Sequence, residues 1–108
     1  MLTGKPIYTE ENQMPAYVIV QGKIENRKLL DQYLAQAGPT VEAHQGRLVA
    51  YAEEPEVIEG PIPHPRTVVL EFPSAKEARA WYDSPEYQKI LPLRVKGAPG
   101  TLIVVKGA

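Results

Sequence analysis

The sequence contains no cysteine, no excess of charge of either sign and no long hydrophobic run. Without cysteine it cannot hold a disulfide framework, a thiol nucleophile or a cysteine-ligated metal. Its 12 basic and 13 acidic side chains leave a net charge of −1 and no basic stripe, so the electrostatic pattern of a nucleic-acid-binding protein is missing. No stretch approaches the roughly 18 apolar residues of a membrane span. Residues 1–13 also lack the apolar run of a secretory signal. We therefore expect a cytoplasmic protein that binds neither nucleic acid nor membranes.

Proline, in contrast, is abundant, with 11 among 108 residues, about twice the usual share of roughly 5%. Most of these prolines lie between segments that have a regular hydrophobic pattern, so they indicate boundaries within a folded chain and not disorder. The length is typical of one domain. Because the first patterned segment begins just after Pro15, we expect residues 1–13 to be a flexible extension and residues 14–108 to form a single domain.

Four segments have the length and the β-branched composition of strands; they are residues 16–24, 47–52, 66–72 and 101–105. Between the first two, apolar residues recur at helical spacing after Asn26, and Pro39 within them predicts a kink or a split of that helix. Between the last two, Ser74 and Ser84 predict the starts of two helical pieces. The order βαββαβ is that of a ferredoxin-like α+β fold, in which helices cover one face of a four-stranded antiparallel sheet.

The other face of this sheet has no helices to cover it. The first, third and fourth predicted strands nevertheless carry apolar residues on both sides. An exposed apolar face of that size usually has a partner, and a symmetric homodimer is the simplest way to provide one. We therefore expect two sheets to pack into one dimeric barrel.

A family resemblance rests mainly on residues 80–88, which read AWYDSPEYQ, preceded by EFPS at residues 71–74. This run resembles the family named domain of unknown function 1330 (DUF1330). Weaker matches include His44, Arg66 and the final residues 105–107. The resemblance covers about residues 14–108. It implies the fold of the dimeric α+β-barrel superfamily and carries no agreed activity.

His44 and Glu71 are the candidate catalytic residues. A histidine near the end of the first helix has a pKa suited to acid–base work, although it could equally be a cation at a helix C-terminus. Glu71 shares a strand face with Thr67 and Val69 and should point into the barrel. A carboxylate there must be paired or have a raised pKa, and Arg66 and Arg94 are its candidate partners.

Four further residues are candidates for binding a substrate: Arg66, Tyr17, Trp81 and Tyr82. Arg66 could orient an anion. Tyr17 would share the barrel side of its strand with Ile19, and its phenol could contact a ligand. Trp81 and Tyr82 could line the cavity, although their helical spacing also fits simple core packing.

These residues lead to two functional hypotheses. The first is a cofactor-independent enzyme that performs acid–base chemistry on a small organic acid or phenol-like metabolite. The second is a non-catalytic or stress-associated module that holds a small ligand. Two histidines without a ligand spacing predict no metal site, and no glycine-rich phosphate or dinucleotide motif is present, so no cofactor is expected.

Overall fold

A computed structural model describes residues 14–108 of the chain; the expected extension, residues 1–13, lies outside the described residues. The elements follow the order β1 (Ala16–Gly22), α1 (Arg27–Glu42), β2 (Arg47–Ala52), β3 (Arg66–Phe72), α2 (Ala75–Asp83), α3 (Pro85–Gly97) and β4 (Gly100–Lys106). This is the predicted βαββαβ arrangement, with the second helical segment divided into α2 and α3. None of the helices within residues 14–108 has the length and hydrophobicity to cross a membrane.

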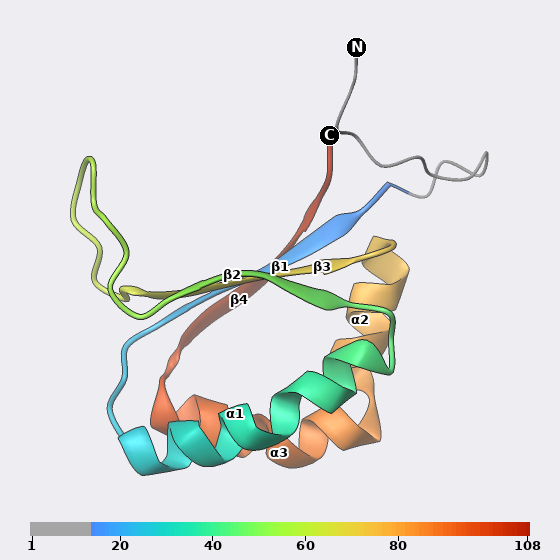
Figure 1. Cartoon of the computed structure of the whole chain (residues 1–108), viewed down its shortest axis with the longest axis horizontal. Coiled ribbons are helices and arrows are strands. Elements are labelled where there is room, and N and C mark those ends of the chain that lie inside the picture. Colours follow the sequence, from blue (N-terminus) through green and yellow to red (C-terminus); the bar gives the residue numbers. More distant parts are fainter. Residues whose placement is uncertain (1–13) are drawn as a thin grey trace.

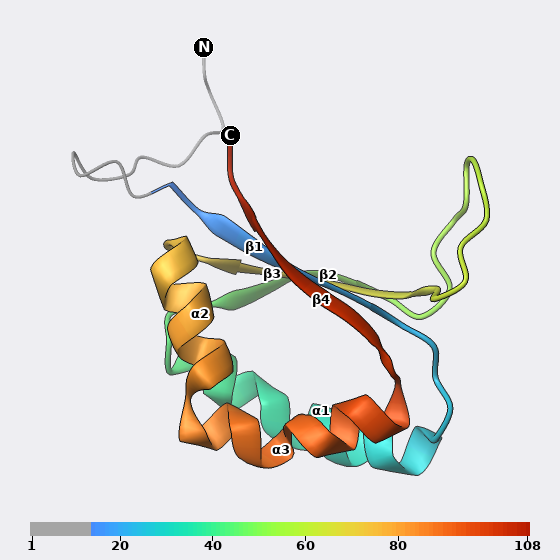
Figure 2. The same ribbon diagram turned by 180° about the vertical axis from the view of Figure 1, so that it is seen from behind.

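The four strands form one antiparallel sheet in the order β2-β3-β1-β4. All three helices lie on the same side of it, which we call the covered face (Figures 1 and 2). Helix α1 packs on α3, whereas α2 contacts β1, β3 and β4 directly. The segment between β2 and β3 extends from the sheet on the side away from the helices (Figures 1 and 2). The opposite side of the sheet is the open face.

Strict alternation assigns strand residues to the two faces. In β1, Val18 and Val20 are buried, whereas Tyr17 and Ile19 are only partly buried. The antiparallel register pairs Val18 with Leu70 and Ile19 with Val69, so the third strand alternates in phase with the first. The ferredoxin-like fold thus separates a buried layer from a partly exposed layer on the same strands.

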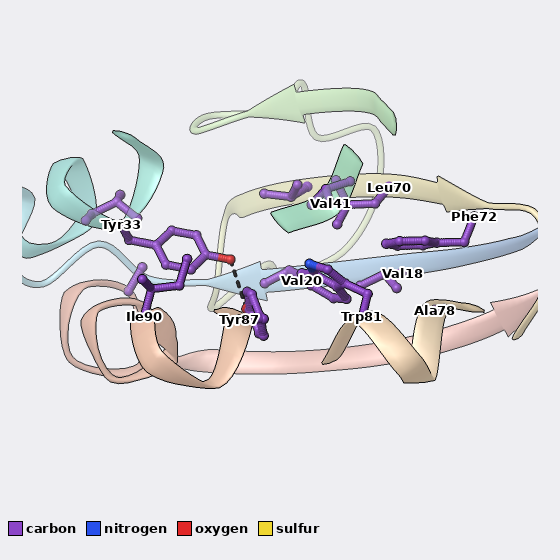
Figure 3. Close-up of a cluster of buried hydrophobic side chains, with 13 residues drawn as sticks. Val18, Val20, Tyr33, Val41, Leu70, Phe72, Ala78, Trp81, Tyr87 and Ile90 are labelled. Carbon is purple, nitrogen blue, oxygen red and sulfur yellow. Dashed lines mark hydrogen bonds between the residues drawn. The ribbon is translucent and has the colours of Figure 1, made fainter. Parts of the chain in front are cut away.

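The core fills the space between the covered face and the helices. Phe72 from β3 packs against Trp81 from α2, with ring centroids 5.4 Å apart, and Trp81 packs against Tyr87 from α3 at 4.1 Å. Figure 3 shows these rings beside the valines of β1. Burying large aromatic surfaces is a major stabilising contribution to a domain of this size.

Side-chain caps define where the helices begin. The side chain of Asn26 accepts the Leu29 N–H at the start of α1, and that of Ser74 accepts the Glu77 N–H at the start of α2. Ser84 lies between α2 and α3: its hydroxyl donates to the Trp81 carbonyl and accepts the Tyr87 N–H. All three caps agree with the sequence, because Asn and Ser side chains supply acceptors to otherwise unpaired amides.

Of the two outcomes expected at Pro39, a kink or a split, the split does not occur. Helix α1 continues to Glu42, because packing on α3 supports the helix beyond its missing hydrogen bond. In α3, Val95 is 50% exposed and the neighbouring Arg94 is buried. A charged residue thus occupies a core position of α3.

Candidate ligand-binding site

A cavity of about 300 Å³ lies between α1 and the covered face of the sheet. Ligand sites in proteins start at about this size, so the cavity suits a small molecule. Its wall is largely apolar, with aliphatic side chains from α1 and the sheet and the rings of Tyr33, Tyr51 and Trp81. Three arginines also line it: Arg66 and Arg94, which are buried, and Arg47, which is exposed.

Arg66 starts β3 with its side chain on the covered face and is only 2% exposed. Its Nε donates to the Tyr51 hydroxyl at 3.2 Å, and its guanidinium lies 5.2 Å from the centre of the Tyr51 ring. Its Nη1 is buried and has no hydrogen-bond partner among residues 14–108. A buried donor without an acceptor is costly, so this N–H group is suited to donate a hydrogen bond to a ligand oxygen.

Arg94 approaches the cavity from α3 and is 5% exposed. Its Nε donates to the Tyr87 hydroxyl at 3.1 Å, and Tyr87 in turn is hydrogen-bonded to the Tyr33 hydroxyl at 2.9 Å. Figure 3 shows the two phenols meeting between α1 and α3. Of these two phenols, Tyr33 is the one that lines the cavity.

Within residues 14–108, the two buried guanidinium groups have no carboxylate partner. Every salt bridge found within the described part of the chain involves other cations. Moving an ion from water into the protein interior costs several kcal/mol unless an opposite charge compensates for it. The site therefore favours an anionic occupant.

Burial raises the pKa of the Tyr33 phenol far above its ordinary value, and the neighbouring Tyr87 raises it further. The positive charges of Arg94 and Arg66 lower the pKa of Tyr33 by less. The Tyr33 hydroxyl therefore keeps its proton at all physiological pH values. It can donate to a ligand but cannot act as a phenolate base.

The cavity brings together two of the six predicted site residues. Arg66 and Trp81 both line it. The Trp81 indole N–H donates to the Thr40 hydroxyl at 3.1 Å, so its polar atom is satisfied within the core. Tyr82 lies on α2 beside a separate hollow next to β4, and its ring contacts those of Trp81 and Tyr87.

Glu71 and Tyr17 lie together on the open face, away from this cavity. The Tyr17 hydroxyl donates to Glu71 Oε2 at 3.1 Å. The predicted ion-pair partners of Glu71, Arg66 and Arg94, were wrong: Arg47 from β2 is its partner, at 2.7 Å. Arg47 and Glu71 are directly opposite in the β2–β3 register, whereas Arg66 points to the covered face.

His44 does not line the cavity either. It follows α1, and its Nδ1 lies 3.6 Å from Glu77 Oε1 on α2. Helix α1 ends at Glu42, and the ring of His44 lies outside the cavity lining. The catalytic roles expected for His44 and Glu71 stay predictions, and the two residues lie on opposite sides of the sheet.

Sequence reasoning missed Tyr33 as a site residue and considered Arg94 only as a partner for Glu71. Tyr33 was indistinguishable from the other core members of the α1 stripe. Arg94 carried a usable indication: it stands seven residues after Tyr87, two helical turns along the buried side of α3. A cation at such a position either pairs inside the protein or meets a ligand.

The described residues also contain no group of three side chains from His, Asp and Glu arranged to hold a metal ion.

The DUF1330 model, a domain of unknown function, matches residues 15–108 of this sequence. The chain belongs to the DUF1330 family. Among curated proteins, none matches the chain.

Solved structures share the fold of this DUF1330 chain. A protein of unknown function from Rhodopseudomonas palustris has a TM-score of 0.72 with 19% identity, and the match covers 98% of each chain. A dimeric ferredoxin-like protein of unknown function from Jannaschia sp. CCS1 has a TM-score of 0.65 with 16% identity, covering 87% of this chain and 98% of that one. Another dimeric ferredoxin-like protein of unknown function, from Thermobifida fusca YX, has a TM-score of 0.60 with 15% identity and 96% coverage of both.

Proposed function

We propose that this DUF1330 protein binds a small organic acid in the cavity between α1 and the sheet. The observation that carries the proposal is that Arg66 lines the cavity and that its buried Nη1 has no acceptor among the described residues. A ligand carboxylate would supply both the missing acceptor and a counter-charge for two buried guanidinium groups.

The wall of the cavity restricts the rest of the ligand. Aliphatic side chains and the rings of Trp81 and Tyr51 would contact it, so a compact, flat and apolar body such as an aromatic ring fits best. Polar sugars and nucleotides would leave their hydroxyl groups without partners against this wall. The favoured ligand is therefore a monocarboxylate with an apolar body.

The lining favours binding over acid–base catalysis. Its sole carboxylate among the described residues is Glu42, which is exposed, and His44 lies outside it. The buried polar groups described above, the guanidinium groups of Arg66 and Arg94 and the Tyr33 hydroxyl, keep their protons and act as hydrogen-bond donors. Such donors stabilise an anion but do not remove a proton from it. We therefore place the binding hypothesis ahead of the enzymatic one.

Benzoate is a suitable test ligand, with benzamide as its uncharged counterpart. Isothermal titration calorimetry should detect binding of benzoate and much weaker binding of benzamide. Arg66→Met should weaken benzoate binding by about tenfold or more, the usual consequence of losing a hydrogen bond to a charged group. Arg79→Met removes an exposed arginine of α2 that lies outside the cavity, and this control should bind as the wild type does.

Benzoate binding that is unchanged by Arg66→Met would overturn the proposed mode of recognition. If neither benzoate nor other small aromatic acids bind the wild-type protein, the function itself is wrong.

The proposal includes a homodimer in which two open faces pack together. Apolar side chains on this face stay accessible in the single chain: Ile103 is 51% exposed and Val105 is 40% exposed. Both pair with β1 residues of the same face, Ile19 and Tyr17. Two ferredoxin-like structural neighbours are themselves dimeric, which supports the same assembly here.

Light scattering at micromolar concentration should give the mass of two chains. Ile103→Asp would place an unpaired carboxylate in the interface and should convert the protein to monomers that keep their circular dichroism spectrum. A monomeric wild-type protein would disprove this assembly.

A further inference from the structure

The hydrogen bonds around Tyr87 determine in which direction its proton points. Tyr87 is fully buried. Its oxygen accepts the Arg94 Nε–H at 3.1 Å, since a guanidinium can only donate. Tyr33 is the other hydrogen-bond partner of the Tyr87 hydroxyl within residues 14–108, at 2.9 Å.

Two arrangements of the protons are conceivable between the phenols, and they differ in cost. If Tyr33 donated to Tyr87, the proton of Tyr87 would be buried with no acceptor, which is unfavourable. If Tyr87 donates to Tyr33, the Arg94 Nε–H and the Tyr87 hydroxyl are both satisfied, and only the proton of Tyr33 is left over. That proton is then free, and Tyr33 is the phenol that lines the cavity.

The hydrogen bonds therefore form a series in which Arg94 donates to Tyr87 and Tyr87 donates to Tyr33. Each donor in such a series polarises the next, and the effect is larger where water is excluded. The charge at its origin is the buried guanidinium of Arg94, which has no carboxylate partner among the described salt bridges. The terminal O–H of Tyr33 keeps its proton, and these hydrogen bonds polarise it as a donor toward an acceptor in the cavity.

We propose that Tyr33 is a ligand-binding residue whose hydroxyl donates to an anionic oxygen of the bound molecule, and that Tyr87 and Arg94 are positioning residues that fix and strengthen this donor. The inference rests on the proposed function, since it assigns a second recognition group to the same cavity. Arg66 Nη1 and the Tyr33 hydroxyl are then the two donors offered to the ligand, one charged and one neutral.

This pair of donors defines the class of ligand more closely. A carboxylate or a phenolate presents oxygen lone pairs that can accept from both groups. Stabilisation of such an oxyanion does not depend on a base, and it favours the ionised form of any weak acid that enters. Phenols are therefore expected to bind as phenolates.

4-Nitrophenol is the probe for this inference, because its ionised form absorbs visible light and reports its own pKa when bound. In the wild-type protein the pKa of the bound probe should be lower than in water. Tyr33→Phe should raise the pKa of the bound probe and weaken binding of the phenolate by about tenfold. Tyr87→Phe leaves the Tyr33 hydroxyl in place but removes its polarising partner, so it should shift the pKa of the probe in the same direction and by less.

Controls separate this role from a purely structural one. Thr101→Val removes a hydroxyl from β4, which lies outside the cavity, and should leave the bound probe unchanged. Thermal unfolding of each variant establishes that it is folded, and the pKa of the bound probe does not depend on stability.

The outcomes distinguish the two proposals. If 4-nitrophenolate binds and responds to Arg66→Met but its affinity and pKa are unaffected by Tyr33→Phe, the role of Tyr33 is disproved while the organic-acid function stands. If Tyr87→Phe leaves the bound pKa unchanged while Tyr33→Phe raises it, the polarising series is disproved and direct donation by Tyr33 stands. If neither 4-nitrophenolate nor benzoate binds the wild-type protein, the proposed function fails.

Discussion

Neighbouring residues of the same strands lie on opposite faces of this sheet, and the two faces differ in which charged and apolar side chains they bury. On the covered face, apolar side chains are buried together with two arginines that have no salt-bridge partner among the described residues; on the open face, the charged residues Arg47 and Glu71 are paired and several aliphatic residues are accessible. The usual placement of charge is thus reversed, because buried charges normally have partners. Packing accounts for the valines and phenylalanine under the helices, but it does not account for Arg66 and Arg94. If the cavity holds the proposed ligand, stability and binding compete on the covered face.

The largest difference between the faces should appear when one valine is shortened on each. Val18→Ala removes two buried methyl groups beneath the helices and should lower the free energy of unfolding by roughly 2–3 kcal/mol. Val69→Ala makes the same change on the open face, where the side chain is only partly buried. In dissociated chains it should cost less than about 1 kcal/mol.

Urea denaturation at several protein concentrations measures both variants. The cost of Val69→Ala should rise with concentration if two open faces pack together. Equal costs at high dilution would show that the faces do not differ.

The next largest effect concerns two glycines in the helical layer over the covered face. A Cβ on Gly97 would lie 2.7 Å from the backbone nitrogen of Leu30, where α3 meets α1, whereas a Cβ on Gly38 would meet nothing within 4 Å. Gly97→Ala should therefore destabilise the protein by about 1–3 kcal/mol through overpacking. Gly38→Ala should stabilise it by up to about 1 kcal/mol, since alanine favours a helix more than glycine does.

Thermal and urea denaturation of the two variants should give changes of opposite sign. A Gly97→Ala protein as stable as the wild type would mean that the contact between α1 and α3 is looser than the structure indicates.

The sequence predicted the fold far better than the site. Strand composition, the caps at Ser74 and Ser84 and the βαββαβ order are local properties, so a single sequence reveals them. The cavity depends on which side chains converge from α1, α3 and β3, and spacing along the chain does not carry that information. Arg66 was predicted because it matches the family resemblance and an arginine can orient an anion, whereas Tyr33 looks like any aromatic core residue until its neighbour Tyr87 is placed beside it.

A smaller effect, of opposite sign to that of Val18→Ala, should follow from removing the unpaired charge on the covered face. Arg66→Met replaces a buried guanidinium that has one unsatisfied nitrogen with an apolar side chain of similar length. The free energy of unfolding without ligand should stay the same or rise by about 1 kcal/mol, and the stabilisation by a given concentration of benzoate should be smaller than in the wild type, because the variant binds benzoate more weakly. Thermal unfolding with and without benzoate measures both the stability of the ligand-free variant and its stabilisation by the ligand. A marked loss of stability in the ligand-free variant would mean that Arg66 serves the fold and not a ligand.

The smallest effect is expected from a charge that has a partner at the exposed rim. Glu53 follows β2 and accepts from Arg27 at the start of α1 at 2.8 and 2.9 Å and from the Tyr51 hydroxyl at 3.0 Å. The hydrogen bond from Arg27, followed by that from Tyr51, lowers the pKa of Glu53 from 4.5 to about 2. Because the folded-state pKa lies below the unfolded one, the stabilisation is complete above the unfolded pKa and is lost as the pH falls toward about 2.

Glu53→Gln should therefore reduce stability slightly at neutral pH and not at all near the folded-state pKa. Urea denaturation across this pH range measures the difference, and added salt should shrink it, since exposed ion pairs are screened. A difference that persists when Glu53 is protonated would trace to the shape of the side chain and not to its charge. Together with Arg66→Met, this variant tests whether an exposed, paired charge stabilises the fold while a buried, unpaired one does not, as expected if the buried arginines are kept for a ligand.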